Sequence, residues 1–185
     1  VFREVLSGLR NAGIPIPLAP TANSAATMRL PAAHFDAVRV GIAMYGLDPF
    51  SRPNPASAFL RPAMTLKTRV VQVKRVAAGI PVSYGGTYVT RAPTTLATVA
   101  GGYGDGLSRL LSSRGQMLVH GRRAPIVGRV CMDMCLLDVG HVPGVAEGDE
   151  VVIMGRQGDE TIGAGEIAEV MDTIHYEVVT GISRR

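Results

Sequence analysis

The chain has 185 residues, of which 46% are hydrophobic and 18% charged, a composition that excludes intrinsic disorder and indicates a folded, rather apolar protein. The net charge is +4, but the basic residues are scattered rather than gathered in a stripe with aromatics, which argues against a nucleic-acid partner. Apolar runs fall short of the ~20 residues of a membrane helix and no signal-peptide pattern opens the chain, so we expect a cytoplasmic protein with no membrane partner.

The first 46 residues read as an α/β unit of the kind found in barrels and wound sheets. Helical spacing at i, i+3, i+4 and i+7 is met by Phe2, Val5, Leu6 and Leu9. This helix is predicted to end at 11–13, and a short helical turn capped by Asn23 or Ser24 is expected next. The apolar run Val38–Gly46 predicts a buried strand. Because the chain starts at Val1 inside a helix and runs out after an apolar stretch, we expect truncation at both ends.

A proline-rich segment at 51–62 separates this unit from a region of different character and is interpreted as a linker. Beyond it, short strands with period-two alternation and glycine-rich turns predict a small β-barrel or sandwich. The predicted strands are Met64–Val76, Thr94–Val99, Gln116–Val119, Ala124–Val130, Met132–Val139 and Glu150–Met154. Helical spacing returns only at Gly163–Met171.

The two cysteines, Cys131 and Cys135, fall in the strand-like part of the chain. Four residues of extended chain put them on one face but too far apart for a disulfide, and without a nearby histidine they make a poor metal site. We interpret both as reduced core residues and expect no metal. Arg129, Cys131 and Asp133 would share one face of the predicted strand, in a structural role.

The stretch Val82–Tyr88 sets Tyr84 between a serine and two glycines. A phenol on a turn can give or take a proton if its surroundings lower a pKa that ordinarily lies near ~10. The alternative is a turn residue with a half-buried ring.

Other segments also admit both a functional and a structural interpretation. Asn23–Ser24 and Gly41–Ile42 suit either a phosphate site after barrel strands or a helix cap with close packing. Arg39, inside an apolar run, either meets a partner or reaches the solvent. Gly101–Gly106 superficially suggests a nucleotide-binding loop, but the segment after it is too short for the required helix. A turn that presents Tyr103 is the better interpretation.

Seven motifs share the order and spacing of one enzyme family. They are Asn23–Thr27, Val38–Gly46, Val82–Tyr88, Gly102–Gly106, Val127–Asp133, Gly148–Val151 and Tyr176–Val178. Together they resemble alanine racemase over essentially the whole chain. The resemblance implies an α/β barrel remnant followed by a mainly-β C-terminal domain, with the last barrel units at 1–50, the linker at 51–62 and the β-domain at 63–185. It further implies pyridoxal 5'-phosphate as cofactor, an amino-acid substrate and a homodimer with shared active sites.

The resemblance also implies roles for individual residues. Tyr84 matches the catalytic tyrosine, which moves a proton at the α-carbon of the substrate, with Met132 and Tyr103 at substrate-binding positions. Cofactor-binding positions are Ser24, Arg39, Gly41, Ile42 and Tyr176, of which Arg39 would face the pyridine nitrogen and the others the phosphate. The access channel would be lined by Tyr103, Arg109, Arg129, Asp133, Ile174 and Tyr176.

One element of the family pattern has no match, the lysine that binds the cofactor and acts as the second base. Lys67 and Lys74 both fall in the first predicted strand of the β-domain. We therefore expect this chain alone to be inactive, as part of an isomerase that supplies D-alanine for the peptidoglycan of a bacterial wall. Alternatives are a racemase of serine or of a broader set of amino acids, and a non-catalytic β-domain that serves as an interaction module.

Overall fold

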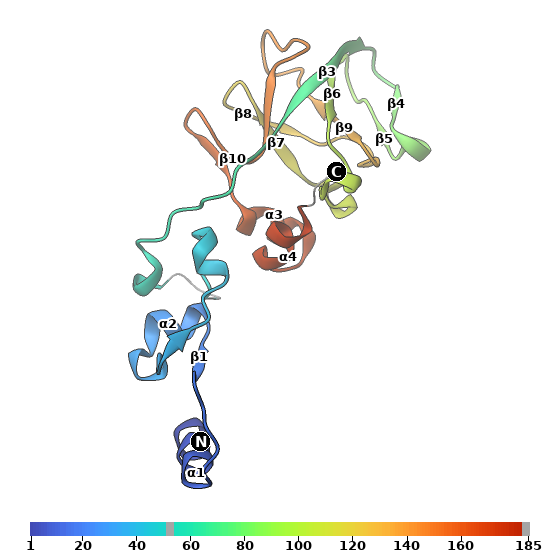
Figure 1. The fold of residues 1–185 in the computed structure, drawn as a ribbon. Coiled ribbons are helices and arrows are strands. Elements are labelled where there is room, and N and C mark those ends of the chain that lie inside the picture. The colour runs from blue at the N-terminus through green and yellow to red at the C-terminus, as the bar shows by residue number, and fades with distance from the viewer. Residues whose placement is uncertain (51–53, 183–185) are drawn as a thin grey trace. The chain divides into compact units, whose positions relative to one another are not determined.

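The structure is a computed structural model that describes residues 1–50 and 54–182. It divides into two compact units, Val1–Ala63 and Met64–Arg185, shown as a ribbon in Figure 1. The expected linker therefore lies partly outside the described residues. Within the described ranges, no helix is both long and apolar enough to cross a membrane.

The first unit begins with helix α1 (Phe2–Asn11), at the expected position. Leu6 is buried, and Phe2 packs edge-on against Phe35 with ring centroids 5.0 Å apart. Strands β1 (Pro20–Ala22) and β2 (Ala37–Val38) pair in parallel, with α2 (Ser24–Arg29) and the 3-10 helix η1 (Pro31–Ala33) between them. A strand, a helix and a parallel strand form the repeating unit of an α/β barrel.

The prediction of a strand at Val38–Gly46 is wrong, because β2 ends at Val38 and the 3-10 helix η2 (Ile42–Tyr45) follows. Gly41 leaves the extended region at φ −117° and ψ −94°, and the Ser24 hydroxyl accepts the N–H groups of Gly41 and Ala43. These two donors are thus satisfied without a neighbouring strand. A second 3-10 helix, η3 (Pro55–Ser57), lies near the end of the unit.

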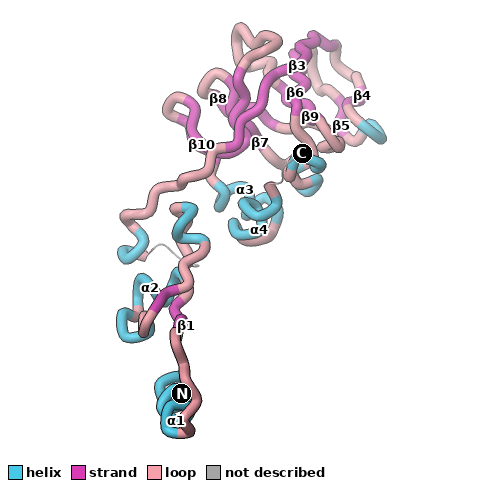
Figure 2. The backbone as a smooth tube through the Cα atoms, viewed as in Figure 1, coloured by secondary structure: helices cyan, strands magenta, loops and turns pink. Residues whose placement is uncertain are grey.

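The second unit is built on an antiparallel sheet, whose strands are drawn in magenta in Figure 2. Its strands are β3 (Leu66–Val76), β6 (Thr94–Ala100), β7 (Gln116–Val119), β8 (Arg122–Pro125), β9 (Met134–Asp138) and β10 (Glu150–Gln157). They run in the order β8-β7-β10-β3-β6-β9, with β11 (Glu160–Ile162) beside β10. An antiparallel bridge between Ile126 and Leu137 joins the end of β8 to β9 and closes the sheet. The expected mainly-β domain is confirmed, and of the barrel and sandwich that the sequence left open, this bridge favours the barrel.

Burial alternates along β9, whereas β7 and β10 bury consecutive residues, so period two marks only some of the strands. Val99, Val119, Leu137 and Val151 are fully buried. Each such side chain contributes about 1.5–3 kcal/mol through burial. Helix α3 (Ala164–Met171) was expected, whereas α4 (His175–Gly181) and the hairpin of β4 (Pro81–Val82) and β5 (Tyr88–Val89) were not.

Arg123 ties α3 to the sheet. Its guanidinium bonds Glu160 at 2.8 Å and Glu166 at 2.5 Å, and these two carboxylates raise the pKa of the arginine further above its ordinary value. Because the three residues come from β8, β11 and α3, one charged group connects three elements.

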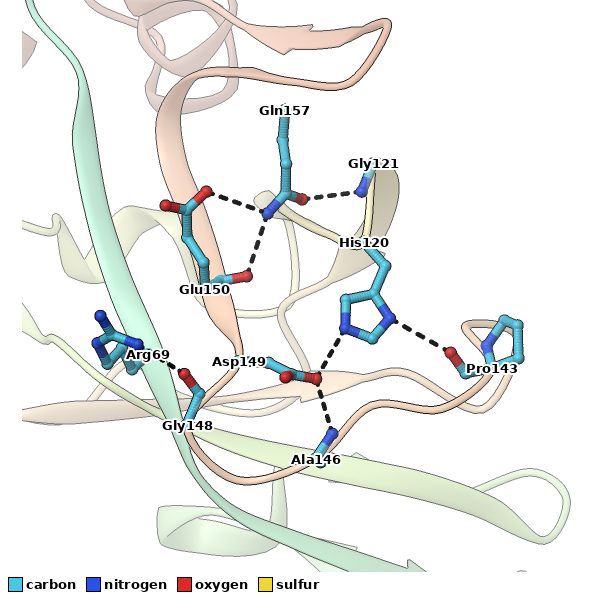
Figure 3. Close-up of polar contacts among 9 residues, drawn as sticks. All are labelled: Arg69, His120, Gly121, Pro143, Ala146, Gly148, Asp149, Glu150 and Gln157. Atoms are coloured by element: carbon cyan, nitrogen blue, oxygen red, sulfur yellow. Dashed lines mark hydrogen bonds and ion pairs between the residues drawn. The ribbon is translucent and has the colours of Figure 1, made fainter.

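A polar network crosses the turn between β7 and β8 and the loop before β10 (Figure 3). The Asp149 carboxylate accepts the Ala146 N–H at 2.8 Å and contacts His120 Nε2 at 2.7 Å. Gln157 accepts the Gly121 N–H at 2.9 Å. The network fixes the β7–β8 turn against its neighbours.

Candidate functional site

The turn that carries Tyr84 is the tip of the β4–β5 hairpin. Pro81 pairs with Val89 and Val82 with Tyr88, which leaves the 3-10 turn Tyr84–Gly86 at the end. Val82 is 3% exposed and packs with Leu96 and Val127, so the base of the hairpin is anchored in an apolar cluster. Tyr84 itself is 75% exposed. Its phenol projects from a fixed support, and the half-buried ring considered for this position is wrong.

A bent segment at 127–133 runs beside this turn, where the sequence predicted strands. Strand β8 ends at Pro125 and β9 starts at Met134, so the expected shared face of Arg129, Cys131 and Asp133 does not exist. The cause is Gly128, whose φ is +76° and whose Cβ, if it had one, would lie 2.6 Å from the Cβ of Ser83. Close approach of the hairpin bends the chain here.

The glycine-rich loop after β6 forms the other wall of the site. The carbonyl oxygens of Cys131 and Met132 accept the N–H groups of Tyr103 at 2.9 Å and Gly104 at 2.8 Å. A Cβ on Gly102 would lie 2.2 Å from the Cys131 oxygen, so glycine is required for this contact. The Gly102 N–H donates to Asp105 at 2.9 Å. The loop is a turn that presents Tyr103, as expected, and resembles no nucleotide-binding loop.

These segments enclose an open recess of about 660 Å³, within the range of small-molecule sites. Its lining residues are Tyr84, Tyr103, Arg109, Arg129, Val130, Cys131, Met132, Asp133 and Met134. The structure thus brings together Tyr84, Met132 and four of the expected channel residues, Tyr103 among them. Two guanidinium groups against one carboxylate favour an anionic ligand such as a carboxylate.

The two cysteines differ in a way that the sequence did not predict. Both are free, but only Cys135 is buried, and burial raises the pKa of its thiol to about 12. Cys131 is half-buried and lines the recess, so its assignment to the core is wrong. The bend at Gly128 turns Cys131 out of the sheet, and no periodicity in the sequence could have shown this.

A second group of expected residues lies in the first unit. Ser24 is buried, and its Oγ accepts the N–H groups of Gly41 at 3.0 Å and Ala43 at 3.3 Å. A hydroxyl that accepts two hydrogen bonds still has its own proton to donate. Gly41 has open space where a Cβ would stand, so an anion can approach its backbone. Ile42 is buried beside it.

Arg39 and Tyr176, the other expected cofactor residues, are exposed. Arg39 directly follows β2, where its backbone N–H donates to the Ala22 carbonyl at 2.6 Å, and its side chain reaches the solvent, one of the two alternatives that the sequence left open. Asn23 is the helix cap that the sequence allowed, since its side chain accepts the Ala26 N–H at 3.0 Å. Tyr176 lies on α4, with its ring centroid 4.9 Å from that of His175. Ile174, the N-cap residue of α4, is 61% exposed.

Comparison with known proteins gives two family matches. The family model described as alanine racemase, C-terminal domain, matches residues 63–185, and the one described as alanine racemase, N-terminal domain, matches residues 1–49. An alanine racemase of Desulfosudis oleivorans is 56% identical over 184 residues, which are 100% of this chain and 47% of that protein. The chain thus spans about half the length of the curated relatives it matches.

Solved structures give the same result. Alanine racemase from Bacillus anthracis with bound L-Ala-P matches with a TM-score of 0.91 and 47% identity, over 98% of this chain and 47% of that one. Alanine racemase from Bartonella henselae with covalently bound pyridoxal phosphate matches with a TM-score of 0.80 and 31% identity, over 98% of this chain and 50% of that one.

Proposed function

The chain belongs to the alanine racemase family, and on that premise we propose that it is part of an enzyme that interconverts L-alanine and D-alanine with pyridoxal 5'-phosphate. The observation that carries the proposal is the recess, which places the exposed Tyr84 phenol on the same cavity as Arg109 and Arg129. A proton-transfer group and a binding site for a carboxylate are what an amino-acid racemase requires.

Racemisation needs a proton removed from one face of the α-carbon and a proton delivered to the other face. Tyr84 Oη is the group that we assign to one face, as a base for one enantiomer and as an acid for the other. The chain's two lysines, Lys67 and Lys74, both lie on β3 and line no part of the recess. We therefore assign the second base to the lysine that the family resemblance implies, which neither of these residues matches.

The residues of the first unit fit the phosphate of the cofactor. The Ser24 hydroxyl keeps its own proton to donate, and the open space at Gly41 lets a phosphate oxygen approach it and the neighbouring backbone at Ile42. Tyr176 would add a phenol to the phosphate, and Arg39 would face the pyridine nitrogen. When bound, the cofactor withdraws electrons from the α-carbon and so acidifies its hydrogen. An arginine at the pyridine nitrogen would keep that atom unprotonated, which limits side reactions.

The substrate carboxylate is assigned to the recess. Met132 is 50% exposed at its wall, and we assign its backbone to contact the carboxylate, with Tyr103 as a second substrate-binding residue. Arg109, Arg129 and Asp133 would line the access channel, joined by Ile174 and Tyr176.

We further propose that the enzyme is a cytoplasmic homodimer whose active sites are shared, and that its D-alanine serves peptidoglycan synthesis. The exposure of large side chains around the recess supports a dimer, since Tyr84, Tyr103 and Met132 are each at least 49% exposed in the single chain. Aromatic residues and methionine are enriched where protein surfaces meet.

The decisive experiment uses Tyr84→Phe in the full-length enzyme that contains this chain. The variant should lose racemisation by a factor on the order of 10² to 10⁴. In deuterated water it should also lose exchange of the α-hydrogen from the alanine enantiomer that faces Tyr84, and keep exchange from the other enantiomer. Unchanged exchange from both would refute the role of Tyr84.

Two controls separate the alternatives. The cofactor absorbance band should stay the same in Tyr84→Phe, because the phenol is assigned to proton transfer rather than to cofactor binding. A wild-type enzyme that turns over L-serine faster than L-alanine would contradict the assigned substrate, and one that binds no pyridoxal phosphate would indicate an interaction module.

A further inference from the structure

Ser83, the residue before Tyr84, has a backbone conformation that is almost reserved for glycine. Its φ is +62° and its ψ is −177°. In this region the Cβ of any other residue is crowded against the backbone, and such residues persist only where their surroundings force them. Glycine would adopt the same conformation without strain. The serine at this position must therefore contribute through its side chain.

That side chain is bonded to the wall of the recess. Ser83 Oγ donates to the carbonyl oxygen of Arg129 at 2.9 Å and lies 3.7 Å from the Sγ of Cys131. Gly128 lets the two segments approach, since its missing Cβ would fall 2.6 Å from the Cβ of Ser83. The segment 128–131 thus contacts Ser83 through Gly128, Arg129 and Cys131.

The same segment positions the other phenol of the recess. The carbonyl of Cys131, a residue that Ser83 contacts, accepts the N–H of Tyr103. The Arg129 guanidinium also lies beside the turn, with one terminal nitrogen 3.9 Å from the position that a Cβ on Gly85 would take. Ser83 therefore connects the Tyr84 turn to the wall that carries Tyr103 and Met132.

We propose that Ser83 is a positioning residue, whose hydroxyl bond to the Arg129 carbonyl holds the Tyr84 phenol in place for proton transfer. The inference rests on the proposed racemase function. Without this bond the turn keeps two glycines, Gly85 and Gly86, both at positive φ, and has more freedom to move the phenol. Displacement of a catalytic group by about 1 Å can slow a reaction by about 10²-fold.

The test compares Ser83→Gly and Ser83→Ala in the full-length enzyme. Ser83→Gly removes the hydroxyl and also relieves the strained backbone, so its melting temperature should equal or exceed that of the wild type. Its kcat should nevertheless fall by roughly 10- to 100-fold. Ser83→Ala keeps the strain and loses the bond, so both kcat and melting temperature should fall. A purely structural role predicts instead that activity follows stability.

Exchange in deuterated water locates the defect. Both variants should slow α-hydrogen exchange from the enantiomer that faces Tyr84 and leave exchange from the other enantiomer and the cofactor absorbance unchanged. Backbone amides at 84–88 should exchange faster than in the wild type. The control is Thr94→Val, which removes a hydroxyl bonded to Asp138 at 2.6 Å, at the opposite end of β6 from the Tyr103 loop. Thr94→Val should lower the melting temperature without slowing α-hydrogen exchange from one enantiomer more than from the other.

Three results would overturn the role of Ser83. They are wild-type kinetics in Ser83→Gly, equal slowing for both enantiomers, and unchanged amide exchange at 84–88. None of these results would contradict the proposed function, provided that the wild-type enzyme racemises alanine. A wild-type enzyme that does not racemise any amino acid would instead refute the proposed function, and with it this inference.

Discussion

Gly128→Ala should destabilise the second unit and displace the Tyr84 hairpin. Gly128 has φ +76°, and a Cβ there would lie 2.6 Å from the Ser83 Cβ and 2.9 Å from the Val82 carbonyl oxygen. The left-handed backbone costs alanine about 1–2 kcal/mol, and overpacking adds about 1–3 kcal/mol. The free energy of unfolding should therefore fall by about 2–5 kcal/mol.

A second glycine separates these two contributions. Gly144 has nearly the same φ, +75°, but no heavy atom lies within 4 Å of the position of its missing Cβ. Gly144→Ala should therefore cost only the backbone contribution, about 1–2 kcal/mol. The difference between the two variants measures the contact between the hairpin and 128–131.

Urea unfolding of the full-length enzyme gives both free energies, and amide hydrogen exchange locates the change. Faster exchange at 81–89 is expected in Gly128→Ala alone. Equal destabilisation by the two substitutions would refute the argument, since it would mean that the hairpin does not press against Gly128. Racemase activity should fall in Gly128→Ala and stay near the wild-type level in Gly144→Ala.

Three further predictions concern parts of the second unit away from the Tyr84 turn. Arg123→Met should cost about 1–2 kcal/mol in urea unfolding, because two ion pairs are lost at a partly exposed site. The Ala146 N–H lowers the pKa of the Asp149 carboxyl below its unfolded value of about 4. The ionised carboxylate therefore stabilises the fold above that pH, and this stabilisation is lost as the pH falls through the lower folded pKa. In Asp149→Asn the free energy of unfolding should consequently fall less steeply below about pH 4. Iodoacetamide should label Cys131 in the native protein and Cys135 only after unfolding, which mass spectrometry would show.

The strands of the barrel were predictable where alternate side chains face a single core. Leu66–Val76 alternates in burial at its start, Gln116–Val119 buries its last three residues, and both were found at or near their expected bounds. The apolar run Val38–Gly46, in contrast, does not form a buried strand. Ile42 is buried but Met44 is 74% exposed, so hydrophobicity there does not report burial in a sheet. The Ser24 hydroxyl, distant in sequence, determines the local conformation by binding two backbone donors.

The site was predictable only in part, for a related reason. Tyr84 and the Gly101–Gly106 turn could be singled out because glycine beside an aromatic residue marks a presented side chain. The bend at 127–133 could not, since it follows from contact between Gly128 and a hairpin far away in sequence. The hairpin strands themselves are two residues each, too short for any periodicity. Ser83 carries no signal in the sequence beyond its place before Tyr84.

The division of the chain into two units separates the tasks of the proposed enzyme. The first unit places the Ser24 hydroxyl, a donor suited to a phosphate, beside the open backbone at Gly41 through a hydrogen bond within itself. The second arranges the Tyr84 turn and the recess, again through its own contacts, with Val82 anchored in the barrel core. Ser24 and Tyr84 are therefore each positioned by contacts of their own unit. A substitution such as Ser83→Gly should consequently change proton transfer without changing cofactor affinity, whereas Ser24→Ala should do the reverse.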